Sequence, residues 1–330
     1  MPTMSHHNTA VATGPWTAKP PTPPPVIIPT LRLSWTEPMK IVPNYQSIDP
    51  ASLSKEDLDI ITQNGREQIA QDNVTKWSYN DRRYAHQILD FLYLGPLTVV
   101  RDKEWLRANG ITLLVAIRDE RQAKLNIMGG NKVAKELGIE AANIDVIGYD
   151  QLVRIFPIAN QAINNHMLRI FREQAVSNPN LPHQDDQMVI DQSNFRRGKV
   201  LVFCETGNDR SACIVLGYLM AVLGMSLVDA FHFVTYKRFC ISIDDNLKRI
   251  LSSYEELLAA MRTVHQHELH LQNFPPALQY EGLPRFIVQK RTIDEMVEDD
   301  DLDRFMAAGS GSVLDEERFF NRTHTPFVDN

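Results

Sequence analysis

A cysteine and an arginine separated by five residues are the strongest chemical signal in the sequence. The segment VLVFCETGNDRS places Cys204 directly after an apolar run and Arg210 at the start of an apolar helical pattern. Such a spacing lets the chain wrap around one phosphoryl group, with backbone N–H groups pointing inward and a helix N-terminus adding its dipole. The spacing predicts a phosphate-binding loop made of Glu205, Thr206, Gly207, Asn208, Asp209 and Arg210.

The side chains of this loop predict a nucleophilic reaction at phosphorus. The loop dipoles and the guanidinium favour the thiolate form of Cys204, which can attack phosphorus and form a cysteinyl-phosphate. Arg210 presents a planar fork to two phosphate oxygens. Ser211 can hydrogen-bond the sulfur and help it leave in the second step. Cys204, Arg210 and Ser211 are therefore the predicted catalytic residues.

The elements that must hold this loop are visible in the hydrophobic pattern around it. Short apolar runs predict strands at 87–95, 111–117, 139–147 and 199–204. Longer amphipathic or apolar segments predict helices at 103–110, 132–137, 151–174, 207–224, 226–238 and 246–264. Alternation of these elements predicts an α/β fold with a mostly parallel central sheet flanked by helices.

Four further segments have a distinctive sequence. They are WSYNDRRYAHQILDFLYLGP (77–96), GITLLVAIR (110–118), RIFP (154–157) and KRFCISIDDNLKRILSSYEE (237–256). Together with the loop, the block from about Trp77 to Ala260 resembles the dual-specificity phosphatases of the protein-tyrosine phosphatase family, and most of all their STYX-like pseudophosphatases. The resemblance implies the cysteine-phosphatase fold.

Two features of the loop depart from that family's pattern. Phe203 stands where the family signature has a histidine, which in active members helps to hold the loop. STYX-like members keep this histidine and replace the cysteine by glycine, so this chain carries the opposite change. Glu205 and Asp209 add carboxylates to the loop. At about 8 Å and an effective dielectric constant of about 20, each would repel a phosphate dianion by roughly 4 kcal/mol.

The general acid has two candidates. The resemblance implies an aspartate on the loop before the helix at 151–174, where Asp150 is the nearest one, with a helix N-cap as its alternative role. An aspartate immediately before the loop arginine also occurs in the active myotubularin and Sac-type phosphoinositide phosphatases. Asp209 is therefore the second candidate acid.

Composition limits the partners. The chain has 34 Lys and Arg against 41 Asp and Glu, a net charge of −7, without a basic stripe or basic amphipathic helix. These features argue against a nucleic-acid or anionic-membrane binder. Three cysteines without a CxxC pair indicate neither a disulfide framework nor a metal site, and favour the cytoplasm or nucleus. Neither a cofactor nor a metal is indicated, and no apolar run is long enough to span a membrane.

Composition also predicts three parts. Residues 1–75 are expected to be a Pro-rich, largely disordered segment with a short helix starting at Ser54, and its proline-dense stretch at 20–29 is either a solvated tail or a ligand for a proline-recognising module. Residues 76–272 are the dual-specificity phosphatase-like domain, and 273–330 an acidic flexible tail. Lacking apolar periodicity, the flanks before about Ala70 and after about Gln272 are expected not to dock.

Two functions fit these features. The first is a STYX-like pseudophosphatase that binds phosphoproteins or signalling partners, such as kinases or ubiquitin-ligase adaptors, through a degenerate loop, as the resemblance implies. The second is an active dual-specificity phosphatase acting on Ser, Thr or Tyr phosphates. It would use Cys204 as nucleophile, Arg210 as clamp, and Asp150 or Asp209 as acid.

Overall fold

A five-stranded sheet lies at the centre of the computed structural model, which describes residues 24–29, 38–71, 76–174, 176–177, 188–189 and 195–273. Its strand order is β3-β4-β9-β5-β6. The strands are β3 (His86–Gln87), β4 (Leu92–Pro96), β9 (Val200–Cys204), β5 (Leu113–Asp119) and β6 (Glu140–Val146). All neighbouring pairs are parallel except β3 with β4. The fold class predicted from the sequence is confirmed, with the cysteine-bearing strand β9 in the middle.

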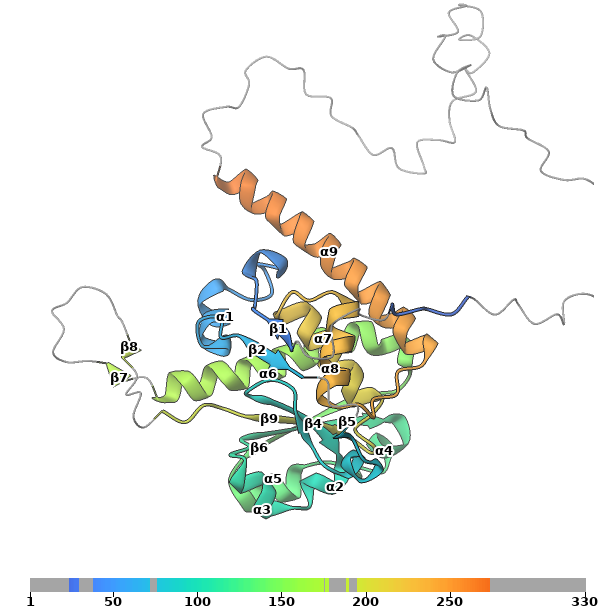
Figure 1. Ribbon diagram of the computed structural model, residues 1–330. Helices are drawn as coiled ribbons and strands as arrows, with labels where there is room; N and C mark the ends of the chain where they lie inside the picture. The colour runs from blue at the N-terminus through green and yellow to red at the C-terminus, as the bar shows by residue number, and fades with distance from the viewer. Residues whose placement is uncertain are drawn as a thin grey trace, which may run out of the picture. The chain divides into compact units, whose positions relative to one another are not determined.

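Helices cover both faces of this sheet (Figure 1). Along β9, side chains alternate: Val200, Val202 and Cys204 belong to one hydrophobic cluster, and Leu201 and Phe203 belong to the other. The first cluster includes the long helices α6 (Leu152–Gln174), α7 (Arg210–Val222), α8 (Leu227–Lys237) and α9 (Asp245–Asn273). The second includes α2 (Leu97–Val100), α3 (Lys103–Ala108) and α5 (Asn131–Leu137). Cys204 thus faces the layer of long helices.

Most of these helices and strands lie where the local sequence patterns predicted them. The helix α8 has Ser226 as its N-cap, whose hydroxyl accepts a hydrogen bond from the backbone N–H of Asp229 at 3.1 Å. The expected single strand at 87–95 is instead two short strands, β3 and β4. They are joined by a tight turn in which the N–H groups of Ile88 and Leu89 donate to the carbonyl of Leu92.

The segment from 39 to 70 packs onto the sheet and helices, so the expectation that the chain before about Ala70 does not dock was wrong. It contains β1 (Met39–Ile41), a 3-10 turn η2 (Tyr45–Ser47), α1 (Lys55–Thr62) and β2 (Gln68–Ala70), with β1 and β2 antiparallel. The helix begins at Ser54 as predicted, but it ends at Thr62 because residues 63–65 have positive φ angles. Apolar side chains of this segment join the main core: Ile41, Ile48, Leu53, Leu58, Ile61 and Ala70.

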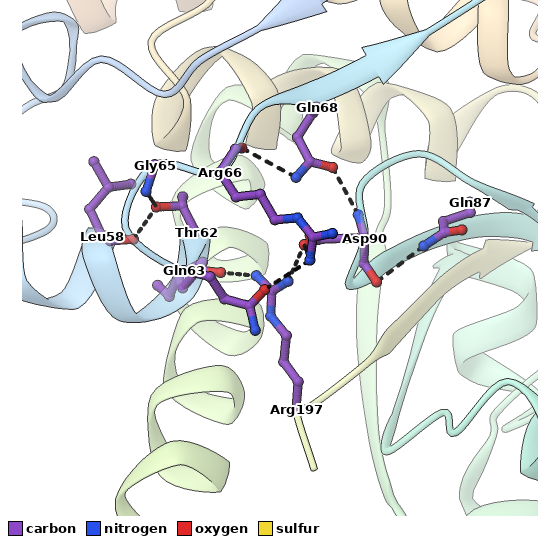
Figure 2. Close-up of polar contacts among 10 residues, drawn as sticks. Leu58, Thr62, Gln63, Gly65, Arg66, Gln68, Gln87, Asp90 and Arg197 are labelled. Carbon is purple, nitrogen blue, oxygen red and sulfur yellow. Dashed lines mark hydrogen bonds and ion pairs between the residues drawn. The ribbon is translucent and has the colours of Figure 1, made fainter. Parts of the chain in front are cut away.

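Polar contacts fasten the same segment to the sheet (Figure 2). The guanidinium of Arg197 donates to the carbonyl of Ile61 and to the carboxylate of Asp90, and it lies 4.7 Å over the ring of Phe91. The side-chain oxygen of Gln68 accepts from the backbone N–H of Asp90 at 3.0 Å. Because these groups are largely removed from water, their loss would leave buried polar atoms unpaired.

The part of this segment around residues 47–49 contacts α9. Asp49 is 3% exposed, and its carboxylate lies 2.5 Å from Nδ1 of His265. Arg262 donates to the carbonyl of Ser47 at 2.9 Å. Polar contacts therefore anchor residues 39–70 at two places, around 47–49 and around 61–68. The predicted acidic tail, apart from Asn273, lies outside the described residues.

Replacing Ile61 by alanine should lower the free energy of unfolding by about 2–5 kcal/mol, because this fully buried side chain leaves a cavity against the core. Ile69→Ala is the matched control, since Ile69 is 43% exposed and a strand residue of that kind changes stability by less than about 1 kcal/mol. Urea unfolding measures both. Equal, small effects would contradict the docking of this segment.

Candidate phosphate-binding site

The loop leaves β9 at Cys204 and enters α7 at Arg210, so it lies at the carboxyl end of the central strand. Gly207 has a φ angle of +74°, and a Cβ atom there would lie 2.4 Å from the carbonyl carbon of Gly95 on β4. No other residue fits this position without moving the backbone. The close approach to β4 sets the curvature of the loop.

Polar groups surround the sulfur of the buried Cys204. The backbone N–H of Gly207 donates to Sγ at 3.1 Å, and the hydroxyl of Ser211 donates to it at 3.0 Å. The thiol in turn donates to Oδ1 of Asp209 at 3.0 Å, an oxygen that also accepts from Thr206 at 3.3 Å. The first two contacts suit a thiolate, whereas the third suits a protonated thiol. The structure therefore brings Cys204, Ser211 and Asp209 together around one sulfur atom.

The two other charged side chains of the loop are held by the start of α4 (Glu120–Lys124). Arg210 donates to Oδ2 of Asp119 at 3.2 Å, and Glu205 accepts from the amide of Gln122 at 3.1 Å. Asp119 and Gln122 are themselves locked together as a capping box. Glu205 therefore leans towards α4. The sequence analysis did not identify Asp119 or Gln122 as partners of the loop. Their Asp-x-x-Gln spacing, directly after a buried strand, is nevertheless the pattern of a capped helix, and this helix begins at the carboxyl end of the sheet, where the loop also lies.

A buried arginine clamps the outer side of the loop. Arg238, at the end of α8, is 0% exposed. Its guanidinium donates to loop acceptors: the carbonyls of Gly207 at 3.0 Å and Thr206 at 3.3 Å, and Oδ1 of Asn208 at 2.8 Å. It also donates to the carbonyls of Tyr84 at 2.7 Å and Arg82 at 3.1 Å. The loop is thus joined to the chain before β3, and the side chain of Asn208 points towards the clamp.

His86 completes the clamp as a neutral imidazole. Its Nδ1 accepts a hydrogen bond from Arg238 at 2.8 Å, since a guanidinium can only donate. Burial and the charge of Arg238 lower the pKa of His86 to about 4. The proton of the neutral ring is therefore on Nε2. This residue and Arg238 were not singled out for the site from the sequence.

The stretch before α6 contains both Tyr149 and Asp150. Asp150 is exposed, lies inside the 3-10 turn η5 (Tyr149–Gln151), and is not the cap of that turn, which is Gly148. Burial raises the pKa of Tyr149, the charge of Arg210 lowers it, and the charges of Asp209 and Asp244 raise it. The phenol therefore lies within the electrostatic reach of the loop. Among the described contacts of Asp150 there is no hydrogen bond to a loop residue.

The position before Cys204 carries no polar side chain. Phe203 is 0% exposed and packs in the second hydrophobic cluster, with Tyr93 and Leu201, on the opposite face of the sheet from Cys204. The other thiols have packing roles. Burial raises the pKa of Cys213, which stays protonated, and Cys240 donates to Oδ1 of Asn208 at 3.4 Å. All three cysteines are free.

In the part of the chain that the structure describes, no group of three His, Cys, Asp or Glu side chains is arranged to hold a metal ion. None of the helices described has both the length and the apolar content needed to cross a bilayer.

The strand, Cys204, the loop shaped by Gly207 and Arg210 at the start of a helix thus lie in the order that the sequence predicted. The model of the dual specificity phosphatase catalytic domain matches residues 92–257, about half of the chain, and the chain belongs to that family. The resemblance seen in the sequence is confirmed.

Within the family, the chain is similar to the serine/threonine/tyrosine-interacting proteins of mouse and human. Each is 27% identical over 196 residues, which cover 59% of this chain and 74% of the relative. Dual specificity protein phosphatase 8 of mouse is 40% identical over 81 residues, 24% of this chain and 12% of that protein. The crystal structure of the human tyrosine phosphatase-like serine/threonine/tyrosine-interacting protein matches 53% of this chain and 97% of its own, at 24% identity and a TM-score of 0.38.

Proposed function

We propose that this protein is a STYX-like pseudophosphatase: a phosphate-loop domain that binds phosphorylated or signalling proteins and turns over phosphate esters poorly. One observation carries the proposal. The carboxylate of Asp209 lies 3.0 Å from the sulfur of Cys204. A thiolate and a phosphate dianion would each be repelled by this negative charge, which is strongest where water is excluded. The loop therefore keeps its cysteine and differs from an active loop in the negative charge placed beside that cysteine.

The surroundings of the loop support impaired turnover. Asp150 is exposed and makes no described hydrogen bond to a loop residue, so no loop residue holds it in place as a general acid. Phe203 offers only apolar surface where active members of the family carry an imidazole. Two separate steps, activation of the thiol and departure of the leaving group, therefore lack their usual support.

The cradle that recognises an anion is nevertheless built. The N–H of Gly207 and the hydroxyl of Ser211 both donate to the sulfur of Cys204, Arg210 is held at the start of α7 by Asp119, and Arg238 holds the outer side of the loop. A site that keeps its anion donors but loses its acid and base is suited to binding. Phosphoproteins, kinases and ubiquitin-ligase adaptors remain the proposed partners, and the cytoplasm or nucleus the proposed location.

A second function is favoured by the same contact. Asp209 can accept the thiol proton of Cys204 as sulfur attacks phosphorus, and can then give that proton to the leaving oxygen as the P–O bond breaks. Water would hydrolyse the resulting cysteinyl-phosphate, releasing phosphate and regenerating the thiol. In this reading the chain is a slow dual-specificity phosphatase with an in-loop acid.

Single-turnover release of the alcohol from an aryl phosphate separates the two functions. The pseudophosphatase predicts no release above that of Cys204→Ser. A burst that requires Cys204, and that disappears in Asp209→Asn, would instead establish the slow phosphatase.

Sulfate or phosphate at millimolar concentration should raise the melting temperature of the intact protein, because an anion bound only to the folded loop stabilises it. Arg210→Ala should abolish the shift, since it removes the main cationic donor. Arg107→Ala, an exposed arginine on α3, is the matched control and should keep it. Differential scanning fluorimetry measures all three. If the melting temperature of the intact protein did not change on addition of these anions, phosphate recognition by this loop would be ruled out.

A further inference from the structure

Part of the proline-dense stretch lies against the helical layer. Residues 24–29, with the sequence PPVIIP, have no regular secondary structure and run past α8 and α9 (Figure 1). At one end, Nε2 of His232 on α8 donates to the carbonyl of Pro29 at 2.7 Å. At the other end, the guanidinium of Arg249 on α9 donates to the carbonyl of Pro24. A segment about 200 residues away in sequence is thus held at both ends by the phosphatase-like domain.

The side chains between these two anchors alternate. Val26 and Ile28 are half-buried, whereas Ile27 between them is 81% exposed. A period of two is the geometry of an extended chain that turns one edge to a surface. Both anchors are main-chain carbonyls, and such contacts do not depend on the side chains of the bound segment. The arrangement is that of a docked peptide, with affinity from the backbone and selection by two apolar positions.

The receiving face has the features of a peptide site. His232 stacks obliquely with Tyr236, their ring centroids 6.5 Å apart, and Phe231 lies edge-on beside it. Aromatic surface between hydrogen-bond donors is what recognises proline-rich extended chains, because prolines fix the backbone and leave its carbonyls free. Arg249 supplies the second donor from the neighbouring helix.

We propose that this face of α8 and α9 is a docking site for extended apolar segments bounded by prolines, and that residues 24–29 occupy it within the same chain. The site is separate from the phosphate loop and does not depend on the proposed function. A partner carrying a segment of this chemistry would have to displace the chain's own segment. A short tether gives that segment an effective concentration of the order of millimolar, so a free peptide competes poorly until the segment is released.

The test uses the full chain and a fluorescent peptide with the sequence of residues 20–30. In the double variant Val26→Asp/Ile28→Asp the chain's own segment carries two charges on its docked edge, and the labelled peptide should bind at least tenfold more tightly than to the unmodified protein. Fluorescence anisotropy measures the dissociation constants. Ile27→Asp is the matched control, since this side chain points to solvent, and should behave like the unmodified protein.

Adding His232→Ala and Arg249→Ala to the double variant should remove peptide binding while the melting temperature stays unchanged, because both side chains act at the surface. Binding that is equal in the double variant and in Ile27→Asp would overturn the proposal. So would binding that survives loss of both donors. The segment could also come from a second copy of the chain, and sedimentation of the unmodified protein tests this. A dimer that dissociates in the double variant would show that two copies exchange the segment, and would overturn docking within one chain.

Discussion

Asp209→Ala is expected to bind sulfate at least tenfold more tightly than the unmodified protein. The carboxylate of Asp209 lies beside the sulfur of Cys204 and accepts from Thr206, so it occupies the part of the loop that an anion must approach. For a sulfate dianion at about 6 Å, the repulsion is about 1.4 kcal/mol at the dielectric constant of water and about 5.5 kcal/mol at an effective value of about 20. The lower figure already corresponds to about tenfold in affinity.

Glu205→Ala is the matched comparison, since it removes the other loop carboxylate. Glu205 is exposed and its side chain accepts from Gln122, so its charge is screened and directed towards α4. The gain in sulfate affinity should therefore be clearly smaller than for Asp209→Ala. Titration calorimetry measures the dissociation constants at constant ionic strength. If Glu205→Ala gave the larger gain, or if Asp209→Ala gave none, the carboxylate of Asp209 would not be what limits anion binding.

The core of this site was predictable because its signals are local. An apolar strand ending at Cys204, a glycine at a position with positive φ, and Arg210 opening an apolar helix each follow from neighbouring residues. The same is true of the sheet, whose buried parallel strands appear as continuous apolar runs. Local patterns also gave the start of α1 at Ser54.

The partners of the loop were not predictable, because they come from distant segments. Arg238 lies 31 residues after Gly207, whose carbonyl it binds, and Asp119 lies 91 residues before Arg210. A single sequence does not show which buried arginine or capping aspartate meets the loop in space. The N-terminal docking was missed for another reason: each of its elements is short, so its apolar residues show no extended periodicity, yet together they fill one side of the core.

Arg238→Leu is expected to lower the free energy of unfolding by about 4 kcal/mol or more and to abolish the sulfate-induced rise in melting temperature. The buried guanidinium satisfies the carbonyls of Gly207 and Tyr84 and the side chain of Asn208, among other acceptors. Each buried acceptor left unpaired costs about 1–3 kcal/mol, and leucine replaces none of the donors. Without the clamp the loop loses its contact with the chain before β3, and the cradle loses its shape.

A comparison of two arginines makes this expectation specific. Arg210→Ala should lose the sulfate effect, because it removes the proposed anion donor, and should keep most of the stability, because the Arg210 side chain is partly exposed and pairs with the partly exposed Asp119. Arg238→Leu should lose both. If Arg238→Leu does not fold, Asn208→Ala removes one acceptor of the clamp and should cost about 1 kcal/mol while weakening the sulfate effect. Chemical unfolding and scanning fluorimetry measure both quantities. An Arg238→Leu protein with unchanged stability and an unchanged response to sulfate would show that the loop keeps its form without the clamp.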